Sequence, residues 1–188
     1  MSDFDYLSVL ISIVLGLGIT NILTAFAGLV RSRSRITMFW PTPLTLVTLF
    51  VIHVQTWWAL FGLRDIRHWT IAGFFMVLMQ PVLLFLASAM LVPDFSGDRP
   101  INLHDDFYRE RGWFYASLLG LLTVSFLRPV VLIHHLSDPI DVGAHLLFIA
   151  MMLFGLLVGR EIVQKFVAAF MFVFIIAYVA VLFVNLPR

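Results

Sequence analysis

The sequence predicts an all-α integral membrane protein, a bundle of six transmembrane helices with short loops and with both termini on the non-cytoplasmic side. Of its 188 residues, 61% are hydrophobic and only 12% are charged, whereas a soluble domain carries roughly 25% charged residues. Six apolar runs are each long enough to cross a hydrocarbon core, which takes about 20 helical residues. Lys and Arg concentrate between these runs. We therefore expect residues 1–188 to form a single transmembrane domain.

The six predicted spans follow the apolar runs. The first run comes after Asp3 and Asp5 instead of a basic stretch and is too long for a signal-peptide core, so we expect a retained helix. Most connections are short, which predicts that neighbours in sequence are antiparallel neighbours in space. In the longer connection before the fourth span, Asn102 is expected to cap a helix that continues into that span. The spans are 4–30, 39–63, 70–92, 112–133, 140–159 and 164–186.

The orientation follows from the basic residues near the ends of the spans. Eight lie after the first, third and fifth spans, and three lie at the other ends, namely Arg64, Arg67 and Arg188. Because Lys and Arg accumulate in cytoplasmic loops, we expect the side with eight to be cytoplasmic and the bacterial cytoplasmic (inner) membrane to be the location. The eight residues are Arg31, Arg33, Arg35, Arg99, Arg109, Arg111, Arg160 and Lys165.

Small residues recur at every fourth position of the first span. Such a row lets another helix come close, because lipid supplies no hydrophobic drive and van der Waals contact must hold helices together. A pore lining is the alternative interpretation. Gly155 and Gly159 form a GxxxG pattern that we expect to pack against the sixth span or a second copy. The row in the first span consists of Ser8, Ser12, Gly16, Thr20, Thr24 and Gly28.

Arg128 is the first candidate for function, because a charge inside a span is costly. His53, His145 and His134 lie on the same outer side at comparable depth. Together these residues predict a binding site for an anion or a polar solute near the outer face. The structural alternatives are that Arg128 reaches outward to the membrane interface and that each histidine bonds to a neighbouring helix.

Two glutamines extend this candidate site. Gln55 lies on a polar face of the second span, and Gln80 in the third span is its most plausible partner in the bundle interior. Glutamine at membrane depth usually forms hydrogen bonds across helices, so a structural bond is the alternative to a role in permeation.

Several classes of site have no support in the sequence. There is no cysteine, which excludes thiolate metal sites and cysteine nucleophiles. No hydrolase, nucleotide-binding or zinc-protease motif occurs, and no basic stripe supports nucleic-acid binding. We assign no catalytic residue, no metal ligand and no cofactor. Haem or metal ligation by His53 with His145 or His134 is an alternative that lacks a repeated His spacing and has an arginine nearby.

The sequence thus predicts a small non-enzymatic membrane protein. We expect it to form a homo-oligomer in the lipid bilayer and to provide a conduit, as a channel or transporter does, or a solute-binding site near its outer face. Six short helices leave little room for alternating access within one protomer, so several copies would enclose a path. The alternatives are an accessory or structural subunit of a larger membrane complex and a haem- or metal-binding redox protein.

Overall fold

The computed structural model describes residues 3–64, 66, 69–97, 99–133 and 139–184. Over these residues the chain forms six long helices, all long and apolar enough to cross a membrane, which confirms the predicted all-α bundle. Two short 3-10 turns, Arg33–Arg35 and Leu60–Leu63, and two short strands, β1 (Ile36–Thr37) and β2 (Ile101–Asn102), complete the described elements. The helices are α1 (Asp3–Arg31), α2 (Pro41–Ala59), α3 (Ile71–Ala89), α4 (Leu103–Ile133), α5 (Pro139–Leu157) and α6 (Glu161–Val184).

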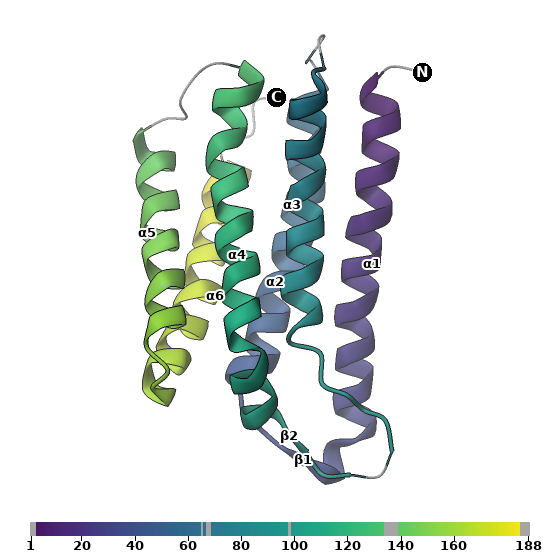
Figure 1. The fold of residues 1–188 in the computed structure, drawn as a ribbon, viewed down its shortest axis with the longest axis vertical. Coiled ribbons are helices and arrows are strands. Elements are labelled where there is room, and N and C mark those ends of the chain that lie inside the picture. The colour runs from purple at the N-terminus through teal and green to yellow at the C-terminus, as the bar shows by residue number, and fades with distance from the viewer. Residues whose placement is uncertain (1–2, 65, 67–68, 98, 134–138, 185–188) are drawn as a thin grey trace.

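The helices pack in two layers (Figure 1). α1, α3, α4 and α5 form a row in that order, and α2 and α6 lie behind it. α2 contacts α1, α3 and α6, and α6 also contacts α5. Every pair of helices that is consecutive in sequence is therefore in contact and antiparallel, as expected. The pairs α1–α3 and α2–α6 are parallel.

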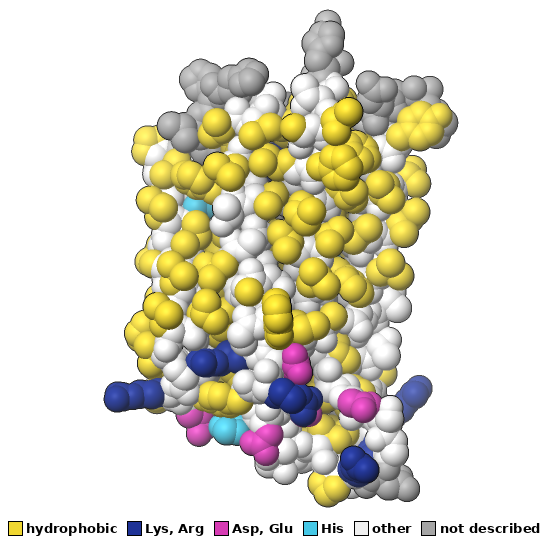
Figure 2. Space-filling model, viewed as in Figure 1, with side chains coloured by type: hydrophobic (Ala, Val, Ile, Leu, Met, Phe, Trp, Pro, Cys, Tyr) yellow, Lys and Arg dark blue, Asp and Glu magenta, His cyan; other side chains and the backbone are white. Residues whose placement is uncertain are grey.

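The two ends of the bundle differ in charge (Figure 2). On the face shown, charged side chains gather at the lower end, and apolar side chains cover the surface above them. α1, α3 and α5 end at the lower end, and α2, α4 and α6 begin there. All eight basic residues named above lie near these helix ends or on the connections between them. We therefore call the lower end the basic end. The exposed apolar belt is the surface that lipid covers in a spanning bundle.

α1 buries one narrow face and exposes the middle of the row of small residues, whereas Gly28 at its end packs against Phe95. Ser12, Gly16, Thr20 and Thr24 are exposed, and a Cβ on Gly16 would meet no atom within 4 Å. Within one chain, this part of the row has no helix against it in the described structure. A close contact there therefore requires another molecule. The buried face consists of Leu7, Ile11, Leu15, Gly18, Ile22, Ala25 and Leu29.

Asn102 starts α4, as the sequence predicts. Its Oδ1 accepts a hydrogen bond from the backbone N–H of His104 at 3.1 Å, and its Nδ2 donates to Asp105 at 2.7 Å. The first bond satisfies a backbone N–H that the first turn of a helix leaves without a partner, and the second joins the capping side chain to that turn. The helix then continues unbroken from Leu103 through Pro129 to Ile133.

Candidate functional site

A group of polar side chains lies between α3, α4, α5 and α6, in the half of the bundle away from the basic end. Arg128 Nη1 donates to Gln80 Oε1 at 3.1 Å, which joins α4 to α3. Ser125 Oγ lies 3.2 Å from His145 Nε2, which joins α4 to α5. Tyr178 on α6 donates from its hydroxyl to Asp141 Oδ1 at 3.5 Å. We call Gln80, Ser125, Arg128, Asp141, His145 and Tyr178 the polar cluster.

His145 uses both ring nitrogens within this cluster. Nδ1 lies 2.9 Å from the backbone carbonyl of Asp141, and because a carbonyl only accepts, Nδ1 carries the proton in that bond. In the neutral ring, Nε2 then accepts from the hydroxyl of Ser125. The Asp141 carboxylate lies 3.7 Å from Nδ1. The imidazole is thus held between α4 and its own helix.

Three contacts define the register of α4 against α5. Gly159 packs on Arg111, Gly155 packs on Tyr115, and His145 bonds to Ser125, so each step along α5 matches an equal step backward along α4. In this register Asp141 is level with Pro129, the residue after Arg128. Arg128 is within electrostatic range of Asp141, but no described carboxylate lies within the 4 Å of an ion pair with it.

Arg128 is directed toward the middle of the bundle. Gly73 packs on Leu132 and Gly120 packs on Leu83, and this antiparallel register places Gln80 about one turn nearer the basic end than Arg128, or ~5.4 Å. Side chains tilt toward the N-terminus of their helix, which for α4 is the basic end. The hydrogen bond to Gln80 therefore directs the guanidinium away from the nearer end of α4. This direction is opposite to the structural alternative, in which Arg128 reaches outward to the membrane interface.

The structure brings only some of the predicted site residues together. Arg128 and Gln80 bond directly, and His145 lies on the adjacent face of the same cluster. His53 contacts α1 instead. Gln55 is half-buried on α2, with no described contact to the cluster, and His134 lies outside the described residues.

His53 is fully buried where α2 meets α1. Its Nδ1 donates to the carbonyl oxygen of Leu49 at 2.8 Å, and its Nε2 lies against Gly18, where an added Cβ would be 2.1 Å away. Nε2 has no hydrogen-bond partner among the described residues. The missing side chain of Gly18 therefore creates the space that the imidazole fills.

A second set of polar contacts, which the sequence analysis missed, lies nearer the basic end. The Tyr115 hydroxyl donates to Gln164 Oε1 at 2.7 Å, and Gln164 Nε2 donates to the carbonyls of Gly155 at 2.9 Å and Val158 at 2.8 Å. Gln164 thus satisfies carbonyls that the C-terminus of α5 leaves without partners. The only sequence signal was a glutamine at the start of an apolar span.

The GxxxG pair packs closely against α4, a partner that was not predicted. Gly155 also contacts the sixth span, which was predicted, because its carbonyl accepts from Gln164 of α6. A Cβ on Gly155 would lie 2.5 Å from the ring of Tyr115, and a Cβ on Gly159 would lie 3.0 Å from Arg111. Arg111 also donates to the Gly155 carbonyl at 3.3 Å. The small residues therefore let two large α4 side chains approach the backbone of α5.

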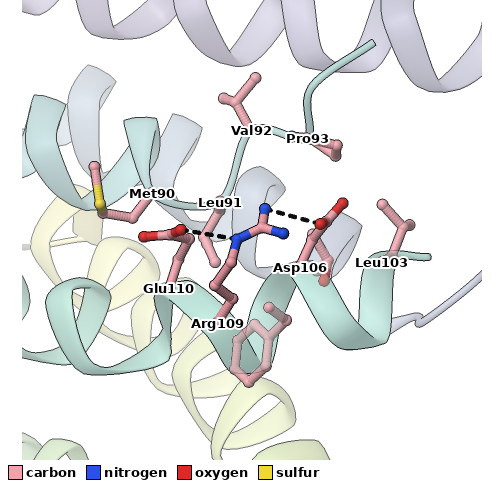
Figure 3. A pocket seen from close by; sticks show the side chains of 10 residues that line it. Met90, Leu91, Val92, Pro93, Leu103, Asp106, Arg109 and Glu110 are labelled. Carbon is pink, nitrogen blue, oxygen red and sulfur yellow. Dashed lines mark hydrogen bonds and ion pairs between the residues drawn. The ribbon is translucent and has the colours of Figure 1, made fainter. Parts of the chain in front are cut away.

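A cavity of about 10 Å³ lies at the basic end (Figure 3), with room for about one water molecule. It is bounded by the end of α3, the start of α4 and Thr42 of α2. Arg109 lines the cavity and forms ion pairs with two other lining residues, Asp106 at 2.9 Å and Glu110 at 3.1 Å. Thr42 Oγ1 is buried with no hydrogen-bond partner in the described structure. A water molecule is therefore the occupant that this cavity fits.

Both described histidines considered for haem or metal ligation are held by the helices around them. Both nitrogens of His145 are engaged, and Nε2 of His53 is closed off by Gly18. No group of three or more potential ligands, such as His, Asp or Glu, converges among the described residues. The backbone N–H groups beside Ser125 lie inside α4, where the helix uses them.

Comparisons with known proteins identify no relative: no protein-family model, no curated protein and no solved structure matches this chain. The chemistry of this protein is therefore inferred from the side chains of the polar cluster. A guanidinium, an imidazole, a carboxylate and a phenol supply charge and hydrogen bonds at one depth in the bundle.

Proposed function

We propose that this chain is a membrane protein that binds an anion or a polar solute at the polar cluster, as a conduit or a binding protein and not as an enzyme. The proposal rests on the small number of hydrogen-bond acceptors around Arg128. Its guanidinium has five N–H donors, and the described residues supply one acceptor, the neutral amide of Gln80. A solute with negative charge or several oxygens would bind the remaining donors and offset the cost of a half-buried charge inside the span.

His145 gives the site a second source of positive charge. Protonation of its Nε2 would turn that atom into a donor and release the Ser125 hydroxyl to donate elsewhere. The Asp141 carboxylate beside Nδ1 would stabilise the imidazolium.

Assembly and orientation complete the proposal. Homo-oligomer formation through the exposed row on α1 would bring several copies together and enclose a path through the membrane. The basic end would face the cytoplasm, because Lys and Arg accumulate on that side. The bacterial cytoplasmic membrane is the location that we propose.

The proposal is tested with purified protein in liposomes, with chloride, nitrate and acetate offered one at a time. Arg128→Gln should lower binding or flux about tenfold, since a hydrogen bond to a charged group contributes about 1.5–3 kcal/mol. Arg160→Gln, which removes an exposed charge at the basic end, is the control. Equal activity of wild type and Arg128→Gln, or no binding of any of these anions, would overturn the proposal.

An accessory subunit of a larger membrane complex is the second candidate function. The exposed small-residue row on α1 favours it, because that surface fits a partner helix of any origin. Gly16→Leu and Thr20→Leu would separate such a contact without disturbing the fold of one chain, since a Cβ on Gly16 meets open space. If these variants dissociate a homo-oligomer, self-assembly is supported. If they release a different, stoichiometric membrane protein, the chain is a subunit.

A further inference from the structure

The cations of the basic end differ in their partners, and Arg111 and Arg160, like the arginines near α1, form no ion pair in the described structure. On α4 and α6, Arg109 pairs with two carboxylates, and Lys165 pairs with Glu161 at 2.6 Å. Near the end of α1 the arginines have no carboxylate within 4 Å in the part of the chain that the structure describes. We call Arg31, Arg33, Arg35 and Arg99 the arginine cluster.

Tertiary contacts build this cluster from two distant segments. β1 pairs with β2 in parallel, with Ile36 opposite Ile101, so the residues just before each strand are neighbours. The Arg35 guanidinium donates to the carbonyls of Phe95 at 3.0 Å and Arg99 at 3.2 Å, and also to that of Gly97. These bonds hold the loop that carries Arg99 beside the end of α1.

Two glycines make this loop conformation accessible. Gly97 has a φ of 71°, which glycine adopts without steric cost. Gly28 lies under the ring of Phe95, where a Cβ would be 2.4 Å from a ring carbon. The side chains of Arg31, Arg33 and Arg99 remain exposed. The cluster is therefore held in place through its backbone. Three of its guanidinium groups stay exposed, and among them Arg33 uses one N–H to donate to the Val30 carbonyl at 3.2 Å.

We propose that the arginine cluster binds the phosphate group of an anionic phospholipid. Guanidinium groups match phosphate oxygens with paired hydrogen bonds, and a phosphate would relieve the repulsion among four like charges. A lipid fits better than a soluble phosphate because the cluster borders the apolar belt: Val30 and Met38 are each 63% exposed. Acyl chains would cover these side chains while the headgroup bonds to the arginines. This proposal is independent of solute binding at the polar cluster.

The test compares two variants that lose the same charge. In Arg31→Gln/Arg33→Gln the cluster is weakened, and Arg35 is kept because it holds the loop. In Arg160→Gln/Lys165→Gln the same charge is removed at the start of α6. Binding of phosphatidylglycerol to each purified protein is measured by native mass spectrometry and by thermal shift, with phosphatidylcholine and inorganic phosphate as separate additions.

We expect phosphatidylglycerol to bind and stabilise the wild type, while phosphatidylcholine and inorganic phosphate do not. At low ionic strength, affinity should fall about fivefold for each cluster arginine removed and should stay near the wild-type value in the α6 variant. An equal loss in both variants would show a general charge effect and overturn the proposal. So would an equal shift with inorganic phosphate, or a shift with polyglutamate but none with phosphatidylglycerol.

Discussion

Nε2 of His53 lies directly against the backbone of Gly18, so the contact between α1 and α2 depends on a glycine that has no side chain to place there. The imidazole cannot easily move away, because its Nδ1 is bonded to the Leu49 carbonyl at 2.8 Å. This relationship assigns His53 a packing role between helices that are adjacent in sequence.

The first prediction is that Gly18→Ala destabilises the protein by about 1–3 kcal/mol, the usual cost of inserting a methyl group into a packed site. The added Cβ would lie 2.1 Å from Nε2 of His53. Gly143→Ala, at an exposed position of α5 where an added Cβ meets no atom within 4 Å, is the control and should not destabilise the protein. Thermal unfolding in detergent measures both, and equal melting temperatures would contradict the described α1–α2 contact.

The second prediction concerns the bond between Tyr115 and Gln164. Tyr115→Phe keeps the ring that packs on Gly155 but leaves the buried Gln164 Oε1 without its donor. We expect a loss of about 1 kcal/mol, within the range measured for hydrogen bonds between membrane helices. Tyr6→Phe removes a hydroxyl from a side chain that is 66% exposed and serves as the control. A Tyr115→Phe protein as stable as the control would argue against the bond.

The third prediction is that Gln80 and Arg128 are energetically coupled. A double-mutant cycle with Gln80→Leu and Arg128→Gln should give a coupling of about 1 kcal/mol in unfolding free energy, because residues that share a hydrogen bond are not additive. Thr123→Val is the control, because in the described structure the Thr123 hydroxyl donates to the Leu119 carbonyl of its own helix. Combining Thr123→Val with Arg128→Gln should give additive effects. Additivity in both cycles would mean that Arg128 does not bond to Gln80.

The fourth prediction is topological. The chain has no cysteine, so single cysteines can be labelled without background. Ser34→Cys lies at the basic end, and Gly62→Cys lies at the opposite end, where no atom crowds the added side chain. In intact cells an impermeant thiol reagent should label the second and spare the first. The reverse pattern would invert the proposed orientation.

The sequence by itself determined the six helices and the charge difference between the ends of the bundle. Both depend on local properties: a long apolar run must form a helix in lipid, because every backbone group needs an internal partner. The cap at Asn102 was predictable for the same reason, since its partners lie two and three residues away. Arg128 and Gln80 were identifiable as candidates because polar groups are costly inside an apolar run.

Only the tertiary structure decided which helix faces meet. In water a buried face is apolar and an exposed face is polar, but in lipid both are apolar, so hydrophobic periodicity does not distinguish them. On α1, Leu15 is buried and Leu17 is 57% exposed, although the two residues are chemically identical. The contacts of His53 with Gly18, of Gly155 with Tyr115 and of Arg128 with Gln80 arise between helices whose rotation and register no local pattern specifies.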